Sequence, residues 1–129
     1  EINAGQCYLL ESSNINMSFS DIKKNYEVAG GTWKELADDL DASLPESIRA
    51  KTLLLLRDIF CDSGESGTLK INCGKFQNNL ENETVENIKQ TLAGADKLWK
   101  QIVPEIDENI EPQYQEKLYH SLIKILCHD

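Results

Sequence analysis

Residues 19–42 read FSDIKKNYEVAGGTWKELADDLDA, and this stretch decides the fold of the chain. Its apolar residues recur at steps of three and four, which is the spacing of the buried face of an α-helix. Gly30-Gly31 interrupts the stretch, and Thr32-x-x-Glu35 resembles a capping box that would begin a new helix. Because the apolar register continues across the glycines, we predict one helix over about 20–42, kinked at Gly30-Gly31, in preference to two helices. The apolar positions are Phe19, Ile22, Tyr26, Ala29, Trp33, Leu36 and Leu40.

Three further helices are predicted from apolar spacing and from proline, which is favoured in the first turn of a helix and breaks one further along. Pro45 and Pro112 lie in the first turns of two of them, and Pro104 marks the end of the helix between. The sequence pattern predicts no internal repeat in the chain. The sequence therefore predicts an all-α fold, a bundle of four main helices that forms a single domain over residues 1–129. The three further helices cover about 45–61, 83–103 and 112–127.

Four cysteines are spread widely along the chain, with no Cys-x-x-Cys pair of the kind that zinc and redox sites use. They are typical of structural disulfides in an oxidising compartment, so we expect the bundle to be stapled by disulfides. Antiparallel helices would bring all four cysteines to one end of the bundle. The simplest pairing is Cys7–Cys127 with Cys61–Cys73, and this geometry leaves the other two connectivities open.

The sequence favours the secretory route. Asn16-Met17-Ser18 and Asn82-Glu83-Thr84 are glycosylation sequons, with Asn16 and Asn82 as the candidate acceptors. We expect Glu1 to follow a removed signal peptide and the protein to be extracellular. The longest apolar run, Leu53 to Leu56, is far shorter than the roughly 18 residues of a membrane span. We therefore expect no membrane insertion.

Charge and residue pattern argue against several function classes. The formal net charge is -9, with a sequence pI of about 4.7. Such a chain repels phosphate backbones, so nucleic acid is not an expected partner. The two histidines, His120 and His128, lack a nucleophile partner, and no serine has the flanking pattern of a nucleophile elbow. We expect neither an enzyme nor a cofactor.

Carboxylates gather in two short stretches, at the end of the first predicted helix and before the last one. Neither stretch has the glycine turn and alternating oxygens of a calcium loop, so we expect no metal site. In the antiparallel scheme both stretches lie at the end of the bundle away from the cysteines. A receptor with a basic surface could bind there. The hypothesised binding residues are Asp38, Asp39, Glu105 and Asp107.

The layout resembles the helical cytokines, which are secreted four-helix chains of this size. The opening also resembles the class II group that includes interleukin-ten, in which a cysteine and aliphatic residues precede a helix with a Phe-x-x-Ile-basic pattern. This resemblance implies a signalling protein that acts through a receptor, although residues 43–46 form a tighter turn than the long crossovers of cytokine bundles allow. The matching residues are Cys7, Leu9, Leu10, Phe19, Ile22 and Lys23.

We therefore expect a secreted, protein-binding signalling factor. One alternative is an extracellular carrier of a small apolar ligand, with a hollow bundle lined by Leu54, Trp33, Trp99 and Tyr114. The two tryptophans lie in the apolar register, however, and this position favours packing in the core. A second alternative is a secreted inhibitor or interaction protein without a signalling role. The sequence names no receptor, ligand or oligomeric state.

Overall fold

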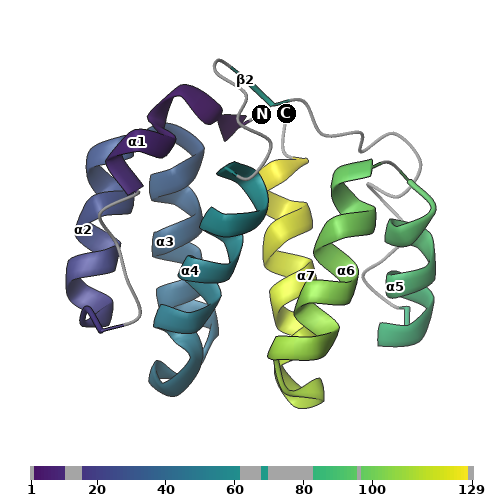
Figure 1. The fold of residues 1–129 in the computed structure, drawn as a ribbon. Coiled ribbons are helices and arrows are strands. Elements are labelled where there is room, and N and C mark those ends of the chain that lie inside the picture. Colours follow the sequence, from purple (N-terminus) through teal and green to yellow (C-terminus); the bar gives the residue numbers. More distant parts are fainter. Residues whose placement is uncertain (1, 11–15, 62–67, 70–82, 96, 128–129) are drawn as a thin grey trace. The chain divides into compact units, whose positions relative to one another are not determined.

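The computed structural model describes residues 2–10, 16–61, 68–69, 83–95 and 97–127. These residues are mostly helical (Figure 1), which confirms the predicted all-α class. The chain divides into two compact units, Glu1–Lys70 and Ile71–Asp129. Each unit is described by itself below. The single domain predicted for residues 1–129 stays a prediction.

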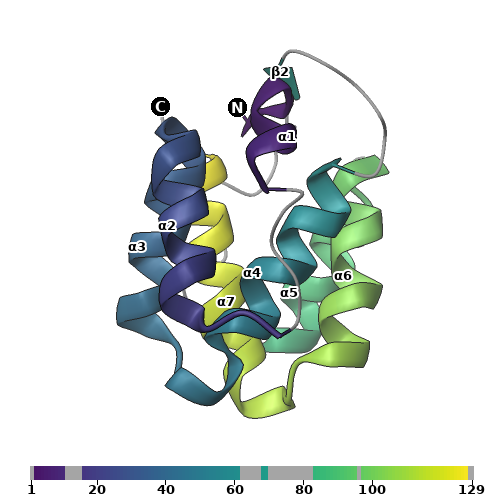
Figure 2. The same ribbon diagram turned by 60° about the vertical axis from the view of Figure 1, so that its left-hand side comes forward.

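The first unit is built on three helices, each running opposite to the one before (Figure 2). The three long helices are α2 (Phe19–Ala29), α3 (Gly31–Ser43) and α4 (Glu46–Cys61), and the short elements are β1 (Ile2–Asn3), η1 (Ala4–Gln6), α1 (Cys7–Leu10) and β2 (Thr68–Leu69). The helix α1 packs on α2 and α4. Near the chain start, β1 pairs antiparallel with β2, with Ile2 opposite Leu69.

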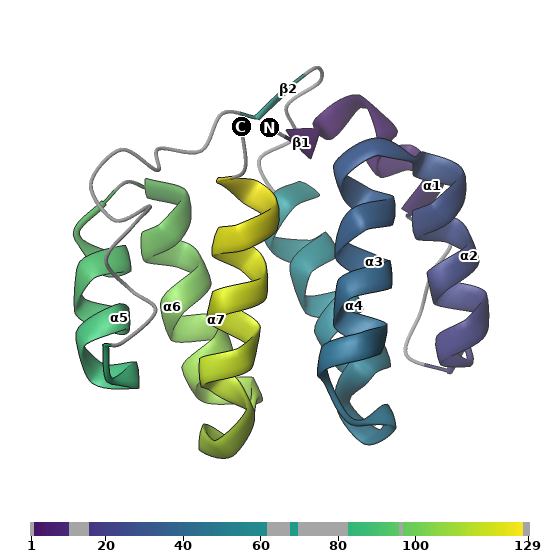
Figure 3. The same cartoon turned by 180° about the vertical axis from the view of Figure 1, so that it is seen from behind.

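The second unit also consists of three helices in an antiparallel succession (Figure 3): α5 (Val85–Ala93), α6 (Lys97–Asn109) and α7 (Pro112–Leu126). Both α5 and α6 pack on α7, and α5 packs on α6. The two helices predicted to begin near a proline, over 45–61 and 112–127, match α4 and α7 to within one residue at each end.

The predicted kinked helix over 20–42 is wrong, because α2 and α3 are separate helices. Gly30 has φ 74° and ψ -172°, a conformation that is essentially restricted to glycine, and its N–H donates to the carbonyl of Tyr26 at 3.1 Å. The chain reverses there, so α2 and α3 lie side by side (Figure 2). The apolar register crosses the glycines because both helices face the same core.

The predicted helix over 83–103 is likewise two helices, and Pro104 does not end the second of them. The helix α6 continues to Asn109 with Pro104 inside it. Proline removes one backbone hydrogen bond from a helix interior. Beyond it, Ile106 and Ile110 are buried at 0% and 2% exposure, so packing holds this end of the helix in place. The described residues thus contain seven α-helices rather than the predicted four.

The core of the first unit is centred on Trp33. This side chain is fully buried and meets two rings edge-to-face, Tyr26 at 5.4 Å and Phe60 at 5.9 Å between centroids. The Tyr26 hydroxyl donates to the carbonyl of Leu53. Burial raises the pKa of this hydroxyl above its ordinary value, so Tyr26 stays a neutral donor. Trp33 therefore packs α2, α3 and α4 together, as its place in the apolar register predicts.

The core of the second unit contains Trp99, which is fully buried. The Tyr119 hydroxyl of α7 donates to the carbonyl of Val103 in α6 at 3.4 Å. Burial raises the pKa of this hydroxyl as well. The remaining buried side chains include Ile88, Leu92, Ile102, Ile106, Leu118 and Leu122.

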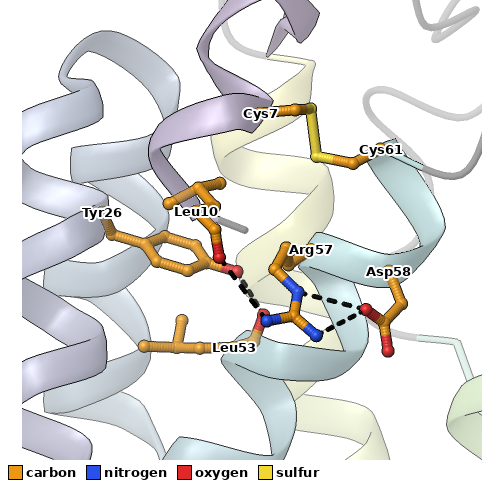
Figure 4. The surroundings of a disulfide bond; sticks show 7 residues. All are labelled: Cys7, Leu10, Tyr26, Leu53, Arg57, Asp58 and Cys61. Carbon is orange, nitrogen blue, oxygen red and sulfur yellow. Dashed lines mark hydrogen bonds and ion pairs between the residues drawn. A yellow bond between two sulfur atoms is a disulfide. The ribbon is translucent and has the colours of Figure 1, made fainter. Parts of the chain in front are cut away.

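The predicted disulfide pairing is wrong. Cys7 is bonded to Cys61, with 5.8 Å between their Cα atoms (Figure 4), so neither Cys7–Cys127 nor Cys61–Cys73 can form. The error follows from treating the chain as one bundle closed end to end, whereas α1 lies at the end of α4 within the first unit. Cys127 is disulfide-bonded too, and Cys73 lies outside the described residues.

We expect Gly30→Ala to lower the free energy of unfolding by about 1–3 kcal/mol, which is the cost of a backbone conformation reserved for glycine. No atom lies within 4 Å of the position that an added Cβ would take, so the loss isolates the backbone term. The control is Gly94→Ala, where φ is -92° and the nearest contact is an ordinary 3.6 Å. Urea denaturation should show a change below about 1 kcal/mol for this control. Equal losses in both variants would contradict the turn at Gly30.

Candidate functional site

In the first unit, cationic side chains of neighbouring helices form ion pairs with the acidic stretch near the end of α3. Lys23 of α2 lies 2.8 Å from the Asp41 carboxylate of α3, and Arg49 of α4 approaches the same carboxylate at 3.2 Å. The hydrogen bond that Lys23 donates to this carboxylate raises the pKa of Lys23. Asp41 therefore connects α2, α3 and α4 through ion pairs, and its first role is structural.

Asp38, one of the hypothesised binding residues, is also in an ion pair. Its carboxylate lies 2.8 Å from Lys34 one turn earlier on α3, and 3.7 Å from Lys23. The hydrogen bond from Lys34 lowers the pKa of Asp38, with a further contribution from the charge of Lys23. Part of the negative charge of this acidic stretch is thus neutralised within the unit.

Asp107 in the second unit is held in the same manner. Its carboxylate lies 2.6 Å from Lys89, whose side chain is 16% exposed, so the pair joins α6 to α5. The hydrogen bond from Lys89 lowers the pKa of Asp107. Glu105 is exposed and accepts from Asn109 at 2.8 Å through its carbonyl and at 3.5 Å through its carboxylate.

The structure divides the four hypothesised binding residues between the two units. Asp38 and Asp39 lie on α3. Glu105 and Asp107 lie on α6. Ion pairs engage Asp38 and Asp107, whereas the Glu105 carboxylate has no cation partner among the described residues.

Neither interhelical ion pair was predicted from the sequence, because each depends on a turn that the apolar spacing does not predict. Lys23 and Asp41 are 18 residues apart, as are Lys89 and Asp107. In one continuous helix, residues at that separation would be about 27 Å apart. The reversals between α2 and α3 and between α5 and α6 bring them into contact. The sequence feature that could have predicted these ion pairs is a lysine near the middle of one helix followed by an aspartate near the end of the next.

Two large apolar side chains are exposed in the first unit. Tyr8 on α1 is 67% exposed, and Val28 on α2 is 71% exposed. The two helices pack against each other. Tyr8 directly follows Cys7, so the disulfide to α4 restricts the position of the backbone that carries it (Figure 4).

The sequon residue Asn16 is exposed, just before α2. The Ser18 hydroxyl caps that helix by accepting from the Asp21 backbone N–H at 3.2 Å. Asn82, the second candidate acceptor, lies outside the described residues. Its sequon ends in Thr84, which caps α5 by accepting from the Asn87 N–H at 3.3 Å. In each sequon the hydroxyl residue is thus also the N-cap of the helix that follows.

We expect Lys89→Met to lower the melting temperature by a few degrees at pH 7, because it removes the ion pair with Asp107. The folded chain lowers the pKa of Asp107, so the pair stabilises above the unfolded value of about 3.9 and this contribution is lost as the pH falls through the folded value. Below about pH 2 the variant and the original chain should melt together. The control is Lys51→Met, at an exposed lysine with no ion pair among the described residues. A pH-independent difference would contradict the role of the ion pair.

Among the residues that the structure describes, no three His, Cys, Asp or Glu side chains are placed to hold a metal ion. In the same part of the chain, no helix combines the length and the apolar composition of a membrane span.

No protein-family model matches the chain, and neither a curated protein nor a solved structure is significantly similar to it.

Proposed function

We propose that the protein is a secreted factor that binds an extracellular protein and signals through a cell-surface receptor. The observation that carries this proposal is the pair of exposed apolar side chains, Tyr8 and Val28, on two helices that pack against each other. Tyrosine is enriched at protein interfaces, where it supplies contact area and a polar hydroxyl. The resemblance to helical cytokines stays a prediction and points in the same direction.

The disulfide supports a binding role for Tyr8. Cys7–Cys61 fixes α1 to α4, and the Arg57 guanidinium donates to the Leu10 carbonyl at 3.5 Å (Figure 4). A side chain on a restrained backbone loses less conformational freedom when a partner binds it. Tyr8 is therefore presented from a preorganised helix despite its exposure.

Charge determines the kind of partner that fits. The net charge of -9 favours a receptor with a basic surface and speeds the encounter with it. The Glu105 carboxylate is exposed and makes a 3.5 Å hydrogen bond with Asn109 but no ion pair among the described residues, so its reversal disturbs few internal contacts. Glu105→Lys should therefore slow association and reduce its salt dependence without altering the fold.

The test of the proposal is saturable binding of labelled protein to cells, followed by the double variant Tyr8→Ser/Val28→Ser. We expect the variant to lose affinity by about tenfold or more, which is the scale of an interface hot spot. The control is Gln113→Ser, an exposed polar position on α7. Saturable binding that is equal in both variants would exclude a binding role for Tyr8 and Val28, and the absence of saturable binding would overturn the receptor function. An apolar molecule retained in native mass spectrometry would instead support the carrier function.

If the protein is secreted, we expect Asn16 to be glycosylated. Protein secreted from eukaryotic cells should lose the mass of a glycan on treatment with peptide N-glycosidase, and Asn16 should become aspartate in the tryptic map. The exposure of Asn16 supports this expectation. The control is Ser18→Ala, which removes the sequon and should leave Asn16 unmodified. An unmodified Asn16 in the original chain would contradict glycosylation at this site.

A further inference from the structure

A constant offset of 66 residues relates the helices of the two units. The helix α3 covers Gly31–Ser43, and α6 covers Lys97–Asn109, so both ends are displaced by the same amount. The first residues of α2 and α5, Phe19 and Val85, have the same offset, as do those of α4 and α7. In both units, three helices therefore follow one another in an antiparallel succession, and their starting residues have the same spacing along the chain.

Individual hydrogen bonds repeat at the same offset. The Ser18 hydroxyl accepts from the backbone N–H three residues later at 3.2 Å, and the Thr84 hydroxyl does the same at 3.3 Å. On the third helix, Arg49 donates to the carbonyl five residues earlier at 2.8 Å. Gln115 donates to the carbonyl five residues earlier, also at 2.8 Å. Two different side chains thus make the same contact at equivalent positions.

The interhelical ion pair repeats as well. Lys23 and Asp41 join the first helix to the second at 2.8 Å, and Lys89 and Asp107 join the corresponding helices at 2.6 Å. Both residue types are retained at positions displaced by 66. A conserved ion pair between helices requires two matched residues and a matched turn, which makes it more specific than a shared apolar pattern.

The buried side chains correspond position by position. Trp33 and Trp99 are equivalent, and both are fully buried. Ile22 with Ile88 and Leu56 with Leu122 are further identical pairs, also fully buried. Where the residue differs, as at Leu40 and Ile106, the volume is nearly kept, which is the change that a packed core tolerates best.

We propose that the chain is a tandem duplication, in which residues 7–61 and 73–127 are two copies of one disulfide-closed three-helix unit. The bonded Cys7 and Cys61 are 54 residues apart, and so are Cys73 and Cys127. The duplication assigns the second disulfide as Cys73–Cys127, equivalent to the first. This inference is independent of the proposed receptor function.

The repeat was not predicted from the sequence, because the two copies have diverged. Only 12 of the 55 aligned positions are identical. The predicted bounds of the equivalent helices, 20–42 and 83–103, also do not differ by a constant offset. Self-similarity at a fixed offset is the signature of a repeated unit. The sequons agree with it, since Asn16 and Asn82 are also 66 residues apart.

The copies share their framework and differ on their surface. Tyr8 and Val28, which are exposed in the first copy, correspond to Gly74 and Gly94 in the second. Asp38 corresponds to Pro104, so the ion pair with Lys34 has no counterpart in the second copy. Retention of core residues, helix caps and cysteine positions, with loss of surface residues, is the pattern expected after duplication of a stable unit.

The test is a crystal or NMR structure of the full oxidised chain, with residues 73–127 superposed on residues 7–61. We expect all three helices of each copy to superpose at the single offset of 66 without an inserted or deleted residue. The Trp99 ring should then occupy the place of Trp33, and the Cys73–Cys127 bridge the place of Cys7–Cys61. A best superposition at another offset, or one that needs an insertion between the helices, would overturn the duplication.

Discussion

Replacing both Cys7 and Cys61 by serine is expected to lower the free energy of unfolding of the first unit by about 4 kcal/mol. This figure is the loop entropy that a bridge removes from the unfolded chain when it spans 54 residues. Arg57 still holds α1 through the Leu10 carbonyl, so the helix should remain docked in the variant. Hydrogen exchange measured by mass spectrometry follows each helix separately and so places the loss along the chain.

The same measurement tests whether the units are separate in stability. If each unit is closed by its own bridge, protection should fall within Glu1–Lys70 and remain within Ile71–Asp129. The control is the reciprocal double variant, Cys73→Ser with Cys127→Ser, which should show the opposite pattern. An equal fall in protection across all helices would indicate one cooperative domain, as the sequence analysis predicted.

Trp33→Ala is expected to lower the free energy of unfolding by about 3–5 kcal/mol, the usual cost of truncating a buried tryptophan. The substitution leaves a cavity between Tyr26 and Phe60, both of which contact the indole ring edge-to-face. Trp33→Phe is the matched control, because it keeps an aromatic ring at the junction of the three helices and should cost less. Circular dichroism during urea denaturation measures both losses.

The two tryptophans make this experiment informative for both units. The chain holds only Trp33 and Trp99, so fluorescence of the Trp33→Ala variant reports the second unit alone. We expect the midpoint of this fluorescence transition to equal the unfolding midpoint of the second unit in the unsubstituted chain. Circular dichroism of the same variant should show that the first unit unfolds at a lower urea concentration. Trp99→Ala should give the mirror result. A loss below about 1 kcal/mol for either variant would contradict the central place of that side chain in its core.

Much of the fold follows from local physical rules in the sequence. Pro45 and Pro112 mark the starts of α4 and α7 because proline suits the first turn of a helix. The apolar register places Trp33 and Trp99 in the two cores. These features depend on residues close together in the chain, so they could be predicted without knowledge of its path.

The errors concern places where tertiary packing decides between local alternatives. A glycine pair permits either a kinked helix or a reversal, and only the packing of α2 on α3 selects the reversal at Gly30. Pro104 is tolerated inside α6 because the apolar residues beyond it are buried. The cysteine pairing depends on the path of the whole chain, and the predicted four-helix path led to the wrong partner for Cys7.

The hypothesised binding residues could be identified from the sequence, but the contacts that they make could not. Net charge and residue clusters identify Asp38 and Asp107, yet the cations that pair with them come from residues four or 18 positions away. The exposure of Tyr8 and Val28 could not be predicted either, because both residues fall in apolar or amphipathic segments whose faces depend on the neighbouring helices.

The most direct test of two disulfide-closed units is a peptide map of the secreted, non-reduced protein. Proteolysis between the cysteines followed by mass spectrometry should yield one linked pair that contains Cys7 and Cys61 and a second that contains Cys73 and Cys127. A linked pair that contains Cys7 and Cys127, or Cys61 and Cys73, would show that the bridges join the units and would contradict this account.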